Sequence, residues 1–423
     1  MFADKGPAFT PWDGPHGNNF TPHPTGLNDS SAPAGVQPAA LVKLQNAPFN
    51  RRNDPWLPAD ASDTDGNNVF AYADLAGPDG FGPGDVRVTT TSAQTFDRMF
   101  DSTEDAAATS AGAVGTHLFY VLNYMHDFFY EAGWDEISNN QQKDNFGRGG
   151  LGGDAIRAEA QDSSGTNNAN FATPPDGQSG RMQMYRFTGP TIDRDGSLDA
   201  EIVLHELTHG LSNRLVGNAA GLNWDPAGGM GEGWSDFYAL SLLNNTNADD
   251  PNGKYASGAY ATYKLGGLLD NYLYGIRRFP YSTDISVNPL TWGDVDDVTY
   301  NQSGGIAASP LGFELNGAME VHNIGEIWAN TLWQMRANII ADPAGANGDV
   351  PTGNRTALQL VTDGLKATPI DPSFTDARDA LIDADCATNA CANERSIWLA
   401  FSKRGLGWGA CTPYNKAFGY PAS

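Results

Sequence analysis

The segment SLDAEIVLHELTHGLSNRLVG, residues 197–217, decides how the chain folds around its centre. Its apolar residues recur at helical spacing, and Ser197 is the expected N-cap, so the pattern predicts one helix. His205 and His209 stand four positions apart in it, and both imidazoles therefore project from one face of that helix. Two nitrogens so placed can bind one zinc ion, and Glu206 lies beside them as a candidate base.

A second segment, EGWSD at residues 232–236, supplies what the two histidines lack. A catalytic zinc ion normally has three protein ligands and keeps its fourth position for water. Glu232 lies 23 positions after His209 and can serve as the third ligand. Asp236, one helical turn later, can accept the spare N–H of a ligand histidine and fix its tautomer. The two segments together predict one catalytic zinc ion bound by His205, His209 and Glu232.

The side chains around this expected ion favour hydrolysis. Zinc polarises a carbonyl group and acidifies its bound water, and Glu206 can take the proton and pass it to a departing amine. A developing oxyanion needs a donor besides zinc. His322, at the start of an expected helix over residues 321–341, is the candidate for that role.

The composition is that of a large, acidic, folded chain. Its 423 residues exceed what one compact core normally serves, which predicts two subdomains. The 50 acidic and 25 basic residues give a net charge of −25, and this disfavours nucleic-acid binding because phosphate contacts need a basic surface. No apolar run is long enough to span a membrane. The first residues lack the pattern of a signal peptide, so we expect a mature or trimmed form.

The expected elements change in kind along the chain, which predicts an α+β fold. Residues 1–195 are expected to form a strand-rich subdomain with one long helix, and residues 196–423 a helical subdomain that carries both motifs. The further expected elements are strands at 69–76, 85–93 and 181–187, a loop-rich region at 139–180, and helices at 110–133, 231–244, 321–341, 354–366, 372–385 and 392–404.

The three cysteines, Cys386, Cys391 and Cys411, lie near the C-terminus. An odd number is compatible with one disulfide and a free thiol, and the sequence leaves the pairing open.

Calcium is a further candidate cofactor, because acidic residues cluster at Asp294, Asp296 and Asp297. The sequence contains no EF-hand pattern, and solvated loop acids are the more common explanation of such a cluster.

The two motifs resemble those of the fungalysin family of secreted metallopeptidases, which belongs to the wider thermolysin-like group. HELTHGLSNRL at 205–215 and GGMGEGWSDF at 228–237 carry the resemblance. Further matches keep the same order along most of residues 60–410: TDGNNV (64–69), FYVLNYMHD (119–127), NNANFATPPDGQSGRMQMY (167–185), IRRFPYSTD (276–284) and EVHNIGEIWA (320–329). The resemblance implies a two-subdomain endopeptidase with its zinc site in the cleft between the subdomains.

The resemblance agrees with the roles assigned above, since it makes Asp236 the acid that orients a ligand histidine and His322 the transition-state histidine. It also implies substrate contacts. Asn170, Phe171 and Ala172 resemble the edge segment that pairs with the substrate backbone.

Two further contacts follow from the same resemblance. Arg277 or Arg278 resembles the arginine that holds a substrate carbonyl, and Arg278 is the preferred choice. Ile202, three positions before the first histidine of the motif, is expected to wall the pocket after the scissile bond. That pocket would take bulky apolar side chains.

Two features of the thermolysin-like group do not carry over. Those enzymes place a tyrosine between the second histidine and the ligand glutamate, and residues 210–231 contain none. Tyr185 and Tyr281 are the alternatives. The acid that steadies the transition-state histidine lies five positions before it in the group, where this chain has Gly317, and Glu320 is the alternative.

We therefore expect a secreted, extracellular zinc endopeptidase that cuts proteins or peptides on the amino side of bulky apolar residues. Family members are made with an inhibitory prosegment, which implies a zymogen, and we expect a monomer without a membrane partner. A zinc aminopeptidase is the alternative, because GAME at 317–320 is similar to a segment that grips a substrate amino terminus. In those enzymes that segment precedes the zinc motif, whereas here it follows.

Overall fold

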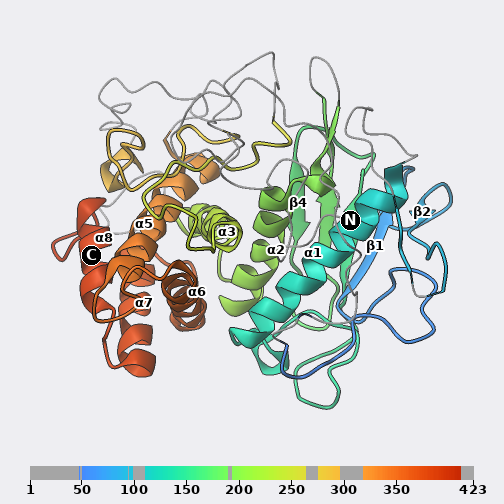
Figure 1. Ribbon diagram of the computed structural model, residues 1–423, viewed down its shortest axis with the longest axis horizontal. Helices are drawn as coiled ribbons and strands as arrows, with labels where there is room; N and C mark the ends of the chain where they lie inside the picture. The colour runs from blue at the N-terminus through green and yellow to red at the C-terminus, as the bar shows by residue number, and fades with distance from the viewer. Residues whose placement is uncertain are drawn as a thin grey trace.

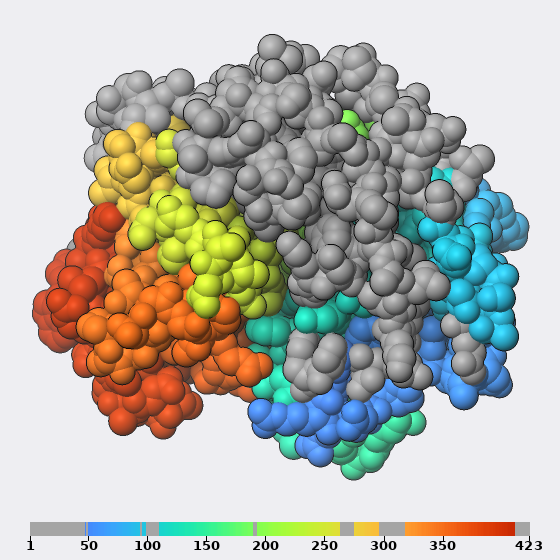
Figure 2. Space-filling model, in the orientation of Figure 1, coloured from blue at the N-terminus to red at the C-terminus, as the bar shows by residue number. Residues whose placement is uncertain are grey.

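The computed structural model describes residues 47, 50–93, 95–98, 110–188, 193–262, 275–295 and 318–410. Strands lie in the N-terminal half of these ranges, and long helices dominate the C-terminal half (Figure 1). The two halves occupy opposite sides of the face seen in the space-filling view (Figure 2). The expected α+β class, strand-rich first and helical second, is confirmed. The subdomain boundary at residue 195 stays a prediction.

A five-stranded sheet forms the N-terminal part, in the order β2-β1-β3-β5-β4. Strands β1, β3 and β5 are parallel, while β2 and β4 pair antiparallel at the two edges. The strands are β1 (Val69–Ala73), β2 (Val86–Arg87), β3 (Ile156–Ala160), β4 (Ala169–Ala172) and β5 (Arg181–Met184), and a separate pair consists of β6 (Arg186–Phe187) and β7 (Arg194–Asp195). Within the described residues, β4 therefore leaves one side of its backbone without a neighbouring strand.

Two helices link the sheet to the rest of the molecule. Helix α1 (Ala111–Glu131) packs on β1 and β3, and helix α2 (Ala200–Leu215) contacts α1, β4 and the first C-terminal helix. Asp199 caps α2, because its side chain accepts hydrogen bonds from the backbone N–H groups of Glu201 and Ile202. Helix α2 thus lies between the sheet and the helical part (Figure 1).

The C-terminal part is a group of packed helices, in which α3 and α5 make the largest contact. The ring centroids of Trp234 on α3 and Trp328 on α5 lie 5.6 Å apart, edge to face, in the core. The helices are α3 (Ala227–Leu243), α5 (Val321–Ala341), α6 (Val350–Ala367), α7 (Phe374–Asn389) and α8 (Glu394–Lys403). The described ranges contain no helix with the length and hydropathy needed to cross a membrane.

Helices α3 and α5 meet at their glycines. A Cβ atom added to Gly233 would lie 2.6 Å from the carbonyl oxygen of Gly325, and one added to Gly325 would lie 2.6 Å from the Cβ atom of Glu232. No side chain fits at such distances, so the two backbones pack directly against each other. This contact sets the position of Glu232 relative to the start of α5.

A buried arginine ties the far end of α2 to the loops around β4. Arg214 is fully buried and donates to the carbonyl oxygens of Pro174 at 2.7 Å and Gln178 at 2.9 Å. Its guanidinium also lies 3.1 Å from the carboxylate of Asp154. The hydroxyl of Thr173 donates to the carbonyl oxygen of His209 at 3.3 Å. The loop that follows β4 is therefore fixed to the helix that carries both histidines.

Several expected elements need correction. Residues 139–180 are not only loops, because β3 and β4 lie there. Strand β3 reads IRAEA and has a single β-branched residue, so its strand character comes from pairing with β1 and β5 rather than from local preference. Ser197 is not the N-cap of α2, since it lies in the short 3-10 helix Gly196–Leu198 before Asp199.

Helix boundaries also differ from expectation. Helix α3 begins at Ala227 rather than at residue 231. Its first turns are rich in glycine, which has a low helix propensity, so they are stabilised by packing and not by a local sequence preference. Helix α6 begins at Val350 rather than 354, after its N-cap Asp349. The expected helix at 321–341 is confirmed with the same limits.

Cys386 and Cys391 form a disulfide with an S–S distance of 2.02 Å. Cys411 lies outside the described residues. Of the acids suggested for calcium, Asp294 accepts hydrogen bonds from the backbone N–H and the hydroxyl of Thr291, and Asp296 and Asp297 lie outside the described residues.

Candidate active site

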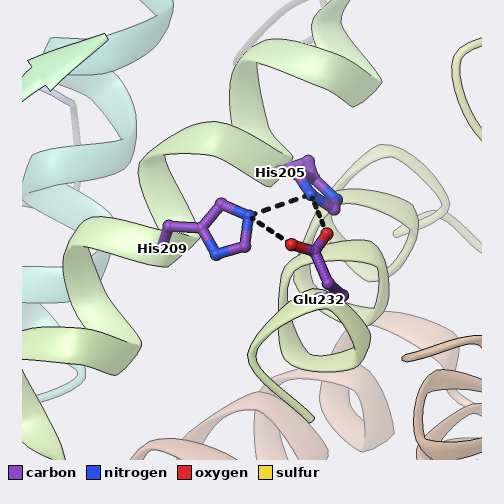
Figure 3. Close-up of side chains that lie close together, drawn as sticks. All are labelled: His205, His209 and Glu232. Atoms are coloured by element: carbon purple, nitrogen blue, oxygen red, sulfur yellow. Dashed lines mark hydrogen bonds and ion pairs between the residues drawn. The ribbon is translucent and has the colours of Figure 1, made fainter. Parts of the chain in front are cut away.

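The two histidines of α2 point toward one place. The Nε2 atoms of His205 and His209 lie 3.1 Å apart, and both side chains are largely shielded from solvent (Figure 3). Their spacing follows from the helix, which puts residues four apart on one face. Burial lowers the pKa of His209 to about 4, which favours a neutral ring with a lone pair available for a metal.

Glu232 reaches the same place from α3 (Figure 3). Its Oε2 atom lies 3.1 Å from His205 Nε2, and its Oε1 atom lies 3.6 Å from His209 Nε2. Zinc bonds of about 2.0–2.2 Å in tetrahedral geometry separate neighbouring ligand atoms by about 3.4 Å. The three side chains therefore have the donor types and the mutual distances that one zinc ion requires.

Asp236 holds the outer side of His205. Its Oδ1 atom lies 2.6 Å from His205 Nδ1, and Arg277 donates to both carboxylate oxygens at 2.6 and 2.9 Å. The hydroxyl of Tyr281 donates to the same carboxylate. Burial opposes the charge of Asp236, but Arg277 and His205 outweigh it and hold the pKa of Asp236 well below its ordinary value. An ionised Asp236 keeps a proton of His205 on Nδ1, which leaves Nε2 as the ring nitrogen that faces Glu232 and would bind an ion.

Glu206 lies on α2 between the two histidines and is 6% exposed. Burial raises the pKa of this carboxyl group to about 7, and the nearby Glu232 carboxylate acts in the same direction. A carboxylate with a pKa near neutrality is well matched to accepting and returning a proton.

His322 meets the site from the first turn of α5. Its Nε2 atom lies 3.4 Å from Glu232 Oε2, and its Nδ1 atom lies 2.6 Å from Glu320 Oε1. Glu320 is also the N-cap of α5, since its carboxylate accepts from the backbone N–H groups of His322 and Asn323. Glu320 thus contacts His322 from the side opposite to Glu232, and Gly317 lies outside the described residues.

Most of these side chains, though not Asp236 and Glu320, line one cleft of about 580 Å³. The candidate triad of His205, His209 and Glu232 lines it, together with Glu206, His322, Ile202 and, from the edge strand β4, Asn170 and Phe171. Ala172 belongs to β4 but is not among the lining residues. Further lining residues not foreseen from the sequence are Leu222, Asn223, Trp224, Ile276 and Val321.

The two arginines of residues 277–278 have different surroundings. Arg277 lines the cleft and pairs with Asp236, whereas Arg278 is fully buried and pairs with Glu326 at 3.2 Å. Arg278 also donates to the carbonyl oxygen of Asn323 at 2.7 Å. The geometry therefore favours Arg277 over Arg278 as an arginine that contacts a ligand in the cleft.

The two suggested tyrosines have other partners. The hydroxyl of Tyr185 accepts a hydrogen bond from Asn170 at 2.8 Å, and Tyr281 binds Asp236. Neither is among the residues that line the cleft. Trp224 does line it and is 67% exposed, in the segment between α2 and α3 where the thermolysin-like group has its tyrosine. A lone large aromatic in a polar loop was the available sequence signal for this residue.

Comparisons with known proteins agree with the motifs. A family model described as Fungalysin metallopeptidase matches residues 24–410. Extracellular metalloproteinase 3 of Arthroderma otae is 40% identical over 82% of this chain and 52% of its own length. Extracellular metalloproteinase 10 of Coccidioides posadasii is 45% identical over 70% of this chain and 44% of its own length. The chain thus spans about half the length of these two relatives.

Among solved structures, the precursor of protealysin, a metalloproteinase from Serratia proteamaculans, is 16% identical. The match covers 73% of this chain and 82% of that one, with a TM-score of 0.43.

Proposed function

We propose that the protein is a zinc-dependent endopeptidase. The chain belongs to the fungalysin metallopeptidase family, which supports this proposal. The observation that supports this most is the meeting of His205, His209 and Glu232 from two helices at mutual distances of 3.1 to 3.6 Å. These three side chains would hold a zinc ion, which would supply the Lewis acidity that activates water and polarises the scissile carbonyl.

The residues around the ligands divide the remaining work. Glu206 accepts the proton of the attacking water and passes it to the departing amine nitrogen. His322, oriented by Glu320, donates a hydrogen bond to the developing oxyanion. Arg277 holds a substrate carbonyl, in place of the Arg278 preferred from the sequence, because it lines the cleft and its guanidinium is fixed by Asp236.

Substrate is aligned by the edge of the sheet. Strand β4 is an edge strand whose residues Asn170 and Phe171 line the cleft, so an extended peptide can add to it as a further strand, with Ala172 continuing the same edge. Ile202, Leu222 and Val321 supply apolar surface close to the ligands. A bulky apolar side chain after the scissile bond suits this surface, which gives cleavage on its amino side.

The relatives are named extracellular metalloproteinases, and on that basis we propose that the chain is secreted. We propose in addition that it is made as a zymogen with an inhibitory prosegment and acts as a monomer on protein or peptide substrates. The aminopeptidase alternative gains no support, because Glu320 of the GAME segment caps α5 and contacts His322 instead of lining the cleft.

The proposal is tested by metal analysis and proteolysis on the same preparation. We expect one zinc ion per chain at the triad, loss of casein hydrolysis on chelation, and recovery on zinc add-back. Amino-terminally blocked peptides should be cut internally before bulky apolar residues. Activity that persists after complete metal removal, or stepwise release of N-terminal residues only, would contradict it.

Replacing His322 by alanine is expected to lower kcat by about 10²–10³, with a smaller change in KM, because an oxyanion donor acts mainly in the transition state. Steady-state kinetics on a blocked peptide measure this split. Glu320→Gln should lower kcat less, since it keeps a hydrogen-bond acceptor beside His322 Nδ1. An unchanged kcat in the alanine variant would remove His322 from the mechanism.

The two arginines form a matched pair of variants. Arg277→Met should lower kcat/KM, because a contact with the substrate and the support of Asp236 are both lost. Arg278→Met should instead lower stability by roughly 3–5 kcal/mol, because it leaves the buried Glu326 without its partner. Kinetics and thermal unfolding of both proteins check this. Normal stability and a large kinetic defect in the Arg278 variant would instead support Arg278 as the arginine that holds the substrate carbonyl.

A further inference from the structure

A second group of convergent acids lies in the sheet. Asp74 follows β1, Glu159 belongs to β3, and Asp162 lies two residues after β3. One oxygen atom from each of the three carboxylates lies within 4.8 Å of the other two. Any two ligands of one calcium ion, with bonds of 2.3–2.6 Å, are at most about 5 Å apart, so these oxygens can share one ion.

These acids are buried, unlike ordinary surface carboxylates. Asp74 is 1% exposed, Glu159 is 0% exposed and Asp162 is 2% exposed. Acidic side chains are almost never so fully buried unless a cation or a set of donors compensates their charge. Among the described residues, Glu159 pairs with the cation Arg181, whose Nε atom is 3.8 Å away and whose guanidinium also lies 3.5 Å from Asp79.

The donors around the cluster leave one carboxylate oxygen without a hydrogen bond. Tyr72 donates to Glu159 Oε1 at 2.5 Å, and Gln183 donates to Asp162 Oδ2 at 2.6 Å. Gly80 N–H donates to Asp74 Oδ2 at 2.8 Å. Glu159 Oε2 is buried and has no hydrogen-bond partner among the described residues. A buried carboxylate oxygen that accepts no hydrogen bond and has only a guanidinium 3.8 Å away is one that a bound cation would satisfy.

We propose that Asp74, Glu159 and Asp162 form a calcium site in the N-terminal sheet. Oxygen-only donors select a hard cation, and three carboxylates match the charge-rich sites that bind calcium rather than zinc. The site differs from the acids Asp294, Asp296 and Asp297 suggested by the sequence, and it does not depend on the proposed function.

The ion would join strands that are distant in sequence. It would link the end of β1 to β3, which pair in parallel with Tyr72 opposite Glu159. Gln183, bonded to Asp162, lies on β5 opposite Asn170 of β4. Calcium would therefore stabilise the part of the sheet that presents the edge strand to the cleft.

A shared proton is the rival account. Burial raises the pKa of Glu159 to about 8, and a protonated Glu159 could then donate to Asp162 without any metal. Under that account Glu159→Gln should be neutral or stabilising, and calcium should have no effect at this place.

The test is a calcium chloride titration by calorimetry of the zinc-loaded protein, with melting temperatures measured with and without calcium. Wild type should bind one more calcium ion than Glu159→Gln and Asp162→Asn, and calcium should raise its melting temperature by a few degrees. Asp383→Asn, which removes an exposed acid of α7, is the matched control and should behave as wild type. Equal calcium binding and equal melting shifts in all four proteins would overturn the site.

A second measurement needs no acidic variant, so a misfolded mutant cannot obscure the result. Terbium bound at the cluster should emit when Tyr72 is excited, because its hydroxyl contacts Glu159. Added calcium should displace terbium and lower this emission, and Tyr72→Phe should also lower it. A terbium signal that neither calcium nor Tyr72→Phe changes would place the ion elsewhere and contradict the proposal.

Discussion

Replacing Glu206 by glutamine is expected to lower kcat by a factor of about 10²–10⁴ while zinc stays bound, because the amide keeps the shape of the side chain but cannot accept a proton. Glutamine has nearly the same size and shape, and Glu206 lines the cleft, so the substitution should not disturb the fold. The raised pKa of Glu206 also predicts that wild-type activity falls as the pH drops through the interval between 4.5 and about 7. A protonated Glu206 cannot accept the proton of water, so activity is lost. A bound zinc ion favours the ionised carboxylate and therefore shifts the loss of activity toward lower pH within this interval.

The measurement combines zinc content, thermal unfolding and hydrolysis of a blocked peptide. Glu394→Gln, which changes an exposed glutamate of α8, is the control and should keep full activity. Full hydrolysis by the Glu206 variant with one zinc per chain would remove this residue from the base role. An acid limb that remains in a residual activity of that variant would assign the titration to another group.

Replacing Glu232 by alanine should abolish both zinc binding and hydrolysis. Two imidazoles would remain, and the carboxylate that lies 3.1 and 3.6 Å from them would be gone. Asp236→Asn is the graded comparison, because it keeps all three ligands and removes only the negative charge and one acceptor oxygen beside His205 and Arg277. Loss of such an outer partner costs about 10–100-fold in metal affinity, and loss of the ligand itself should cost more.

Competition with a chelating dye gives the zinc affinities in order, and wild type should be tightest, followed by the Asp236 variant and then the Glu232 variant. Both variants keep a Cβ atom, so the close contact between Glu232 and Gly325 is preserved. Equal zinc affinity in the Glu232 variant and wild type would show that another side chain completes the site.

The grouping of His205, His209 and Glu232 could be predicted from the sequence because helical spacing brings the two histidines together and the EGWSD motif indicates the glutamate. His205 and His209 are neighbours by the geometry of one helix, and the EGWSD segment has its own periodicity. The choice between Arg277 and Arg278 was not accessible in this way. The two arginines are adjacent in an irregular segment. They differ only in their partners, because Arg277 pairs with Asp236 and Arg278 pairs with Glu326.

The sheet was harder to predict than the helices. Strand β3 consists mostly of alanines and charged residues. Its parallel neighbours are far away in the sequence: Glu159 lies opposite Tyr72, 87 positions earlier, and Ala158 lies opposite Met182, about 24 positions later. Such pairings leave no local pattern, so the acids at Asp74 and Asp162 could not be connected from the sequence. The same reason hid the carboxylate cluster.

The anchoring of Arg214 has a consequence for substrate capture. Through Pro174, Gln178 and Thr173, the helix with both histidines and the strand that would align a peptide are fastened into one body. A peptide bound to that strand would therefore keep a fixed register relative to His205 and His209, even if other parts of the molecule changed position.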